Sequence, residues 1–173
     1  MIHTVGHSTR AIDDFIALVR EGDVRTLVDV RRQPFSRRHP QFSRDALARS
    51  LADAGIAYVH EVDLGGHREP RPDSPNTAWR NDALRGYADH AASREFQEAL
   101  ARVATLERAV VMCAEANPSD CHRQILADAL VARGVDVRHL TVPGRVEAHV
   151  LHPRAVRRGD VLVYPAVEQL RFG

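Results

Sequence analysis

Two cysteines, Cys113 and Cys121, are the residues in this sequence best suited to nucleophilic chemistry. Cys113 ends an apolar run, and Glu115 follows it two residues later. Cys121 stands before His122 and Arg123 at the start of a predicted helix, where free amide hydrogens and neighbouring cations lower the pKa of a thiol. We therefore favour Cys121 as the nucleophile. Cys113 is equally well explained as a small core residue, because free cysteine is among the most buried residue types.

Other residues able to do chemistry follow two more predicted strands. His7 precedes the hydroxyl residues Ser8 and Thr9, and it suits a general base or a ligand as well as it suits a cap for the next helix. Asp29 ends a second strand, and Arg31 follows it in the next loop. An ion pair with Arg31 explains Asp29 slightly better than a catalytic role does.

A basic and aromatic segment spans residues 31–42. It holds four arginines, among them Arg31 and Arg37, and one histidine, with two phenylalanines between them. Phosphates and stacked bases favour this mixture. The alternative is a solvated loop in which Phe42 packs on the next helix, but that interpretation leaves Phe35 and the arginines unexplained.

Metal binding is chemically open to Cys113, Cys121, His122 and His7, which include suitable ligand types. However, Cys-x7-Cys-His matches no usual structural zinc spacing, and the chain has no second cysteine pair. We therefore expect no metal site, and no residue pattern identifies a cofactor.

The elements that position these residues alternate between strand and helix along the chain. Apolar runs predict five strands, and apolar residues at helical spacing predict helices between them. The strands are expected at 2–5, 26–30, 56–59, 109–112 and 135–142, and the helices at 12–21, 43–54, 93–104 and 125–133. This order predicts an α/β domain of three layers, with a mostly parallel sheet and helices on both faces. Ligands bind at the carboxyl ends of such strands, so the polar residues above should share one rim.

Two regions depart from the alternation. Residues 60–81 are rich in glycine and proline without periodicity, and loops this long are usually functional or disordered. Within this loop, Gly65 and Gly66 would let a backbone approach a ligand, although a glycine pair alone is weak evidence. Beyond residue 144, the run 161–164 is expected to pair with the alternating stretch 146–150, which predicts an appended hairpin or edge strand. We therefore expect one domain over 1–153, with a C-terminal extension over 154–173 packed on it.

Composition excludes several classes of protein. The chain has 24 basic and 23 acidic residues, 44% hydrophobic residues and 27% charged residues, which indicates a folded domain and excludes general disorder. The near-zero net charge argues against a chain that is basic throughout, as many nucleic-acid binders are. No run approaches the ~20 apolar residues of a membrane span, and no export signal is evident, so we expect a cytoplasmic protein with free thiols. All basic residues are arginine, which excludes a lysine-based mechanism.

Four ordered motifs resemble the family called domain of unknown function 488. They are residues 5–9, residues 28–38, residues 64–66, and residues 113–115 followed by 121–123. The resemblance implies a single α/β domain whose motifs gather at one end of the sheet, and it implies no activity. It places family positions on His7, Ser8, Thr9, Asp29, Arg31, Pro34, Arg37, Gly65, Gly66, Cys113, Glu115, Cys121, His122 and Arg123. A looser likeness to rhodanese-like and cysteine-phosphatase domains fails, because nine residues separate Cys113 from Arg123 and Pro118 lies between them.

The preferred hypothesis is an enzyme that binds a phosphorylated, nucleotide-like or other anionic substrate. Arginines 31, 37 and 123 would hold the anion, Cys121 or Cys113 would act as thiolate, and His7 or His122 would move protons. One alternative is a nucleic-acid-binding module that uses residues 31–42. A further alternative is a thiol redox or metal sensor, which requires the two cysteines to approach one another. The sequence specifies no oligomeric state.

Overall fold

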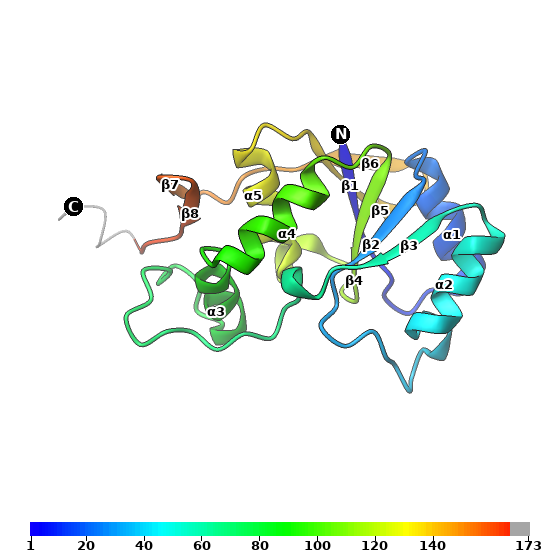
Figure 1. Cartoon of the computed structure of the whole chain (residues 1–173), viewed down its shortest axis with the longest axis horizontal. Coiled ribbons are helices and arrows are strands. Elements are labelled where there is room, and N and C mark those ends of the chain that lie inside the picture. The colour runs from blue at the N-terminus through cyan, green and yellow to red at the C-terminus, as the bar shows by residue number, and fades with distance from the viewer. Residues whose placement is uncertain (167–173) are drawn as a thin grey trace.

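Five parallel strands and one antiparallel edge strand form the central sheet of the computed structural model, which describes residues 1–166 (Figure 1). The strand order is β3-β2-β4-β1-β5-β6. The bounds are β1 Ile2–Gly6, β2 Thr26–Asp29, β3 Ala57–His60, β4 Ala109–Cys113, β5 Val137–Val142 and β6 Arg145–Ala148. The first five strands run parallel and follow the predicted alternation with helices, which confirms the expected α/β class.

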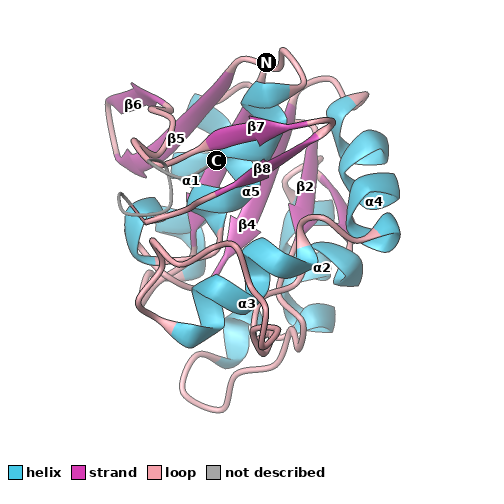
Figure 2. Cartoon of the chain, turned by 90° about the vertical axis from the view of Figure 1, so that its left-hand side faces the viewer, coloured by secondary structure: helices cyan, strands magenta, loops and turns pink. Residues whose placement is uncertain are grey.

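Helices cover both faces of the sheet (Figures 1 and 2). One face packs against α1 (Ile12–Glu21) and α2 (Arg44–Asp53), and the other packs against α3 (Asp82–His90), α4 (Arg94–Ala104) and α5 (Arg123–Ala132). Strand β4 shows why two covered faces are needed, because all five of its residues are buried and none is charged. Val110 and Met112 face the first layer, whereas Val111 and Cys113 face the second. The period of a strand therefore directs Cys113 toward α4 and α5.

The caps of two helices show how local sequence sets their starts. The side chain of Ser93 accepts a hydrogen bond from the Phe96 amide at the start of α4, where a helix was expected to begin. Asn81 caps α3 in the same way through the Leu84 amide. Helix α3 was not predicted, because it follows the Gly- and Pro-rich loop directly. Ser43 stands at the start of α2 without capping it, and its hydroxyl instead accepts a bond from the Ser36 amide.

The C-terminal region contains both an edge strand and a hairpin. β6 folds back onto β5 through a turn in which Gly144 has φ +75°, and the two strands pair antiparallel. β7 (Val156–Arg158) and β8 (Val161–Val163) form a separate two-stranded sheet. The expected pairing of 146–150 with 161–164 is therefore wrong. The physical reason is that β6 forms its backbone hydrogen bonds with the open edge of β5. The turn before β8 then brings β8 back to pair with β7. The last part of the predicted extension, residues 167–173, lies outside the described residues.

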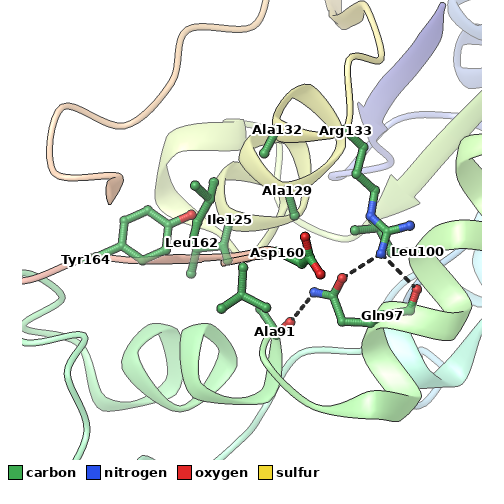
Figure 3. Close-up of a pocket in the computed structure, with 11 residues that line it drawn as sticks. Ala91, Gln97, Leu100, Ile125, Ala129, Ala132, Arg133, Asp160, Leu162 and Tyr164 are labelled. Atoms are coloured by element: carbon green, nitrogen blue, oxygen red, sulfur yellow. Dashed lines mark hydrogen bonds between the residues drawn. The ribbon is translucent and has the colours of Figure 1, made fainter. Parts of the chain in front are cut away.

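The β7–β8 hairpin packs against α4 and α5 (Figure 3). Leu162 and Tyr164 lie against Ile125 there, and Arg133 hydrogen-bonds the side chain and backbone of Gln97 beside them. The hollow left between these elements has a volume of about 10 Å³, which suffices for about one water molecule. It is therefore packing space and no ligand site. Within residues 1–166, no helix is long and apolar enough to cross a membrane.

Candidate functional site

A cleft of about 1000 Å³ opens at the carboxyl ends of β1, β2 and β4. Such a volume suits a ligand of drug or nucleotide size. Its walls come from the loops after these strands, the loop after β3 and the start of α3. The lining residues are His7, Ser8, Thr9, Arg31, Arg32, Gln33, Phe35, Ser36, Arg38, His39, Gly66, His67, Asn81, Ala83, Leu84, Ala114, Glu115, Ala116, Asp120, Cys121 and His122.

Eight of the predicted site residues line this cleft, and five do not. Those that line it are His7, Ser8, Thr9, Arg31, Gly66, Glu115, Cys121 and His122. Those that do not are Cys113, Asp29, Arg37, Gly65 and Arg123. Four of these five are buried behind the cleft wall, while Arg37 is exposed away from it.

The loops after β1 and β4 are held together by backbone contacts. The amides of His7 and Ser8 donate to the carbonyls of Cys113 and Ala114, at 3.0 and 2.8 Å. Gly6 lies so close to the Glu115 carbonyl that a Cβ atom would overlap it, and Ser8 has φ 50°, a left-handed conformation costly for a serine. Backbone hydrogen bonds and close packing therefore both fix the position of this part of the cleft wall.

The two cysteine sulfurs lie 3.4 Å apart. Cys113 is fully buried, whereas Cys121 lines the cleft and is 4% exposed. Cys121 Sγ also accepts a hydrogen bond from the Arg123 backbone amide, at 3.3 Å, where α5 begins. Cys121 thus borders the cleft with little of its surface exposed, and Cys113 lies directly behind it.

These surroundings shift the pKa values of the two thiols in opposite directions. The hydrogen bond from Cys113, the charge of Arg123 and the Arg123 amide lower the pKa of Cys121 to about 7, against the effect of burial. Burial raises the pKa of Cys113 well above its usual range, and its hydrogen bond to Cys121 acts in the same direction. Cys121 therefore forms the thiolate more readily than Cys113, which keeps its proton.

Arg123 is buried behind the cleft wall and supports the loop that carries Glu115. It is 1% exposed, and its guanidinium donates to the carbonyls of Glu115 and Ala116 and to the hydroxyl of Thr4. These bonds hold the loop between the two cysteines. Arg123 was expected to bind a substrate anion directly. Its buried position does not fit that role, because its guanidinium group points into the protein interior and donates to protein oxygens.

Arg31 is fixed in the cleft wall by a buried ion pair. Its Nε and Nη2 donate to the two oxygens of Asp29, at 2.9 and 2.6 Å, and Nη2 also donates to the Phe42 carbonyl. Asp29 is fully buried and also accepts a bond from the Tyr58 hydroxyl. The carboxylate therefore orients the guanidinium, which agrees with the ion-pair interpretation of Asp29.

His7 lies between Arg31 and Phe42. Its ring stacks on Phe42 with centroids 4.3 Å apart, and Nδ1 contacts the Ser8 carbonyl at 2.9 Å. A carbonyl oxygen only accepts, so Nδ1 carries the proton and Nε2 accepts from Arg31 Nη1 at 3.3 Å. Burial lowers the pKa of His7 to about 4. His7 is therefore a neutral imidazole at physiological pH, with its basic nitrogen beside the arginine.

His122 packs against Gly66, whereas Gly65 packs against Val62 and Arg32. A Cβ on Gly66 would lie 2.9 Å from His122 Nδ1, and a Cβ on Gly65 would lie 2.9 Å from the Val62 carbonyl. The glycines thus permit close packing within the chain. The His122 ring lies 4.9 Å from the Tyr87 ring, and burial lowers its pKa to about 4. Its Nε2 is buried and has no hydrogen-bond partner among residues 1–166.

The basic segment divides between the core and the rim. Phe42 is buried with α1 and α2, as the hydrophobic interpretation predicted. Arg32, Phe35 and Arg38 line the cleft, and Phe35 is 68% exposed. Arg37 is exposed and does not line the cleft, so its expected role in anion binding has no support from its position.

Sequence reasoning missed the far wall of the cleft. Asn81 and Leu84 at the start of α3 line it, together with His67, which has φ 58°. A signal was present in the sequence, because Leu84, Tyr87 and Ala91 recur at helical spacing after a residue type that favours the cap position.

The metal question centres on Cys113, Glu115 and Cys121. Their ligand atoms all lie within 4.8 Å of one another, and no other such group occurs among residues 1–166. Burial alone would raise the pKa of Glu115, but the hydrogen bond from Cys113 and nearby positive charges lower it. Zinc is the ion that two thiolates and a carboxylate suit best. The expectation of no metal stays a prediction.

The fold and the cleft together define a class, namely a doubly covered α/β domain whose strand ends carry a thiol, imidazoles and arginines. A family model described as Domain of unknown function DUF488 matches residues 11–130. The chain therefore belongs to this family. The match begins after His7, Ser8 and Thr9 and ends before β5. No curated protein matches the chain.

Proposed function

We propose that this protein is a cysteine-dependent enzyme acting on a phosphorylated, nucleotide-like or other anionic substrate. Cys121 is the nucleophile, and its sulfur accepts hydrogen bonds from the Cys113 thiol and the Arg123 amide. The single observation that carries the proposal is that this stabilised sulfur lines the same cleft as the pinned guanidinium of Arg31. A pure binding module needs no such thiol.

The charges around the cleft favour an anion. Three arginines line it, namely Arg31, Arg32 and Arg38, compared with two carboxylates, those of Glu115 and Asp120. Arg31 is held by Asp29, so binding it costs little side-chain entropy. Planar guanidinium groups match phosphate and carboxylate oxygens in pairs. The expected compartment is the cytoplasm, where reducing conditions keep both thiols free.

A single-stranded nucleic acid is the second candidate ligand. One specific observation favours it, because Phe35 stands 68% exposed on the rim of the same cleft as Arg32 and Arg38. An exposed aromatic ring beside arginines suits a base stacked next to its phosphate. Binding of a short fluorescent oligonucleotide should then weaken steeply with salt. Affinity that is absent or insensitive to salt would exclude this candidate.

The enzyme proposal is tested by the pH dependence of alkylation, followed at each cysteine by mass spectrometry of the folded protein. Cys121 should react with an apparent pKa near 7, while Cys113 should stay unreactive until the protein unfolds. Adenosine monophosphate or inorganic phosphate should slow alkylation by occupying the cleft. Reaction of Cys121 only near the ordinary thiol pKa of about 8.5 would contradict the proposal.

Neighbouring arginines supply a matched pair of variants. Arg38 lines the cleft, whereas Arg37 is exposed outside it. Arg38→Ala should weaken protection by adenosine monophosphate about tenfold, which is typical for the loss of one charge-assisted hydrogen bond. Arg37→Ala should leave protection unchanged. Equal effects of the two changes would show that the anion is attracted by overall charge and not held in this cleft.

A further inference from the structure

The buried thiol of Cys113 supports the nucleophile by a hydrogen bond, and its position also suits it to a reaction of its own. It lies 3.4 Å from Cys121 Sγ, and its other polar contact is the Glu115 carbonyl at 3.7 Å. A disulfide bond is about 2.0 Å long, so the sulfurs need approach by only about 1.4 Å to form one. Cys113 ends β4 and Cys121 precedes α5, and only the loop between them needs to adjust.

The pair has the asymmetry of a two-step thiol reaction. Cys121 lines the cleft and meets any ligand first, whereas Cys113 is fully buried and is reached only through Cys121. Its retained proton keeps Cys113 from competing for the ligand. A group that becomes attached to Cys121 is therefore held directly in front of a second thiol.

We infer that the site reduces anionic disulfides, with Cys121 as the attacking thiol and Cys113 as the resolving thiol. This inference rests on the proposed function, since it uses the same nucleophile and the same cleft. It names the substrate class as a small disulfide that carries carboxylate or phosphate groups for Arg31, Arg32 and Arg38. A hydroperoxide is less suited, because a cleft of about 1000 Å³ greatly exceeds so small a molecule.

The chemistry balances in two exchange steps. The Cys121 thiolate attacks one sulfur of the substrate, an S–S bond forms to Cys121, and the other half leaves as a thiolate. Cys113 then attacks Cys121 Sγ, so the Cys113–Cys121 disulfide forms and the bound half leaves as a second thiolate. The proton of Cys113 passes to a leaving thiolate, and the Glu115 carboxylate, within 4.8 Å of both sulfurs, can carry it. The substrate gains two electrons and the protein loses them, and an external dithiol restores the reduced pair.

The test compares three aliphatic disulfides that differ in net charge. Reduced full-length protein is mixed with oxidised glutathione, hydroxyethyl disulfide or cystamine, which are anionic, neutral and cationic. Products are mapped by mass spectrometry after acid quenching. Wild-type protein should form the Cys113–Cys121 crosslink with release of two thiols per disulfide consumed. Cys113→Ser should instead stop at a stable mixed disulfide on Cys121, because serine keeps a donor but cannot resolve it.

Charge selectivity is the second readout. Oxidised glutathione should react at least tenfold faster than cystamine at low salt, and added salt should narrow this ratio. Equal rates, or a preference for cystamine, would overturn the assignment of anionic disulfides. If Cys113→Ser does not fold, the wild-type protein alone tests the resolving role of Cys113. Mass spectrometry then finds either the Cys113–Cys121 crosslink or a mixed disulfide on Cys121.

The failures are distinguishable. A mixed disulfide that persists on Cys121 of the wild-type protein overturns the resolving role and leaves the nucleophile standing. No reaction at Cys121 in either protein overturns both this inference and the proposed function. A pair that reacts only after a chelator removes bound zinc would be a metal site, and that outcome also overturns the inference.

Discussion

Mild acid should destabilise this protein through three buried histidines. Burial lowers the pKa values of His7, His122 and His139 to about 4, from an ordinary value of 6.5. Between pH 6.5 and about pH 4, these three histidines therefore bind protons in the unfolded chain but not in the folded chain. The stability contributed by each neutral ring is fully present above pH 6.5, is lost as the pH falls, and stops changing below about pH 4.

The size of the effect follows from the two pKa values. Between pH 7 and pH 5, one such histidine lowers the free energy of unfolding by about 2 kcal/mol. Three independent histidines would lower it by about 5–6 kcal/mol, which is comparable with the whole stability of many domains. We expect the protein to be folded at pH 7 and close to its unfolding midpoint near pH 5.

Urea unfolding at pH 7 and at pH 5 measures this difference. His7→Gln is a suitable variant, because glutamine can still donate to the Ser8 carbonyl but does not titrate. The change will lower stability at both pH values, so the informative quantity is the difference between them. That difference should shrink by about 2 kcal/mol. Titration of the imidazole signals by NMR gives the folded-state pKa values directly.

Two results would refute this reasoning. One is a stability that stays constant within 1 kcal/mol from pH 7 to pH 5. The other is an unchanged pH difference in His7→Gln, which would mean that His7 titrates in the folded protein as it does in the unfolded chain.

Three further changes test single contacts. Asp29→Asn should cost about 3–5 kcal/mol of stability in thermal unfolding, because it leaves a buried guanidinium without its charged partner; a loss below 1 kcal/mol would mean that water replaces the carboxylate. Gly6→Ala should cost about 1–3 kcal/mol or more, since the new Cβ overlaps the Glu115 carbonyl, and unchanged urea unfolding would show that the loop yields freely. Tyr164→Phe should cost about 1–3 kcal/mol by leaving Asp128 one hydrogen bond short, and an unchanged melting temperature would contradict that value.

The sequence was sufficient to predict the parallel sheet, because its strands are covered on both faces and therefore appear as uninterrupted apolar runs. One helix and one strand pairing escaped prediction for physical reasons. Helix α3 is short and follows a Gly- and Pro-rich loop, so its cap at Asn81 was hidden among other polar residues. The partner of β6 depends on which edge is open, and edge occupancy is decided by the whole sheet.

The candidate site was predictable in position and less so in orientation. Residues that directly follow parallel strands reach one rim by topology alone, which accounts for His7, Arg31 and Glu115. The direction of a long side chain depends on tertiary partners, so the inward turn of Arg123 could not be read from the sequence. The contact between the two sulfurs also depends on how the seven residues between them fold, and their spacing alone does not fix it.

The central place of β1 has a consequence for how the chain folds during its synthesis. β1 lies between β4 and β5, and Ile2 pairs with Ala109 on one side and Val137 on the other. At about 5–20 residues per second, an emerging β1 waits roughly 5–30 s for both neighbours. During that time an apolar strand with two unpaired edges is open to other chains. Soluble yield should therefore depend on cooler growth and on chaperones that shield nascent strands, even though the finished fold covers this strand completely.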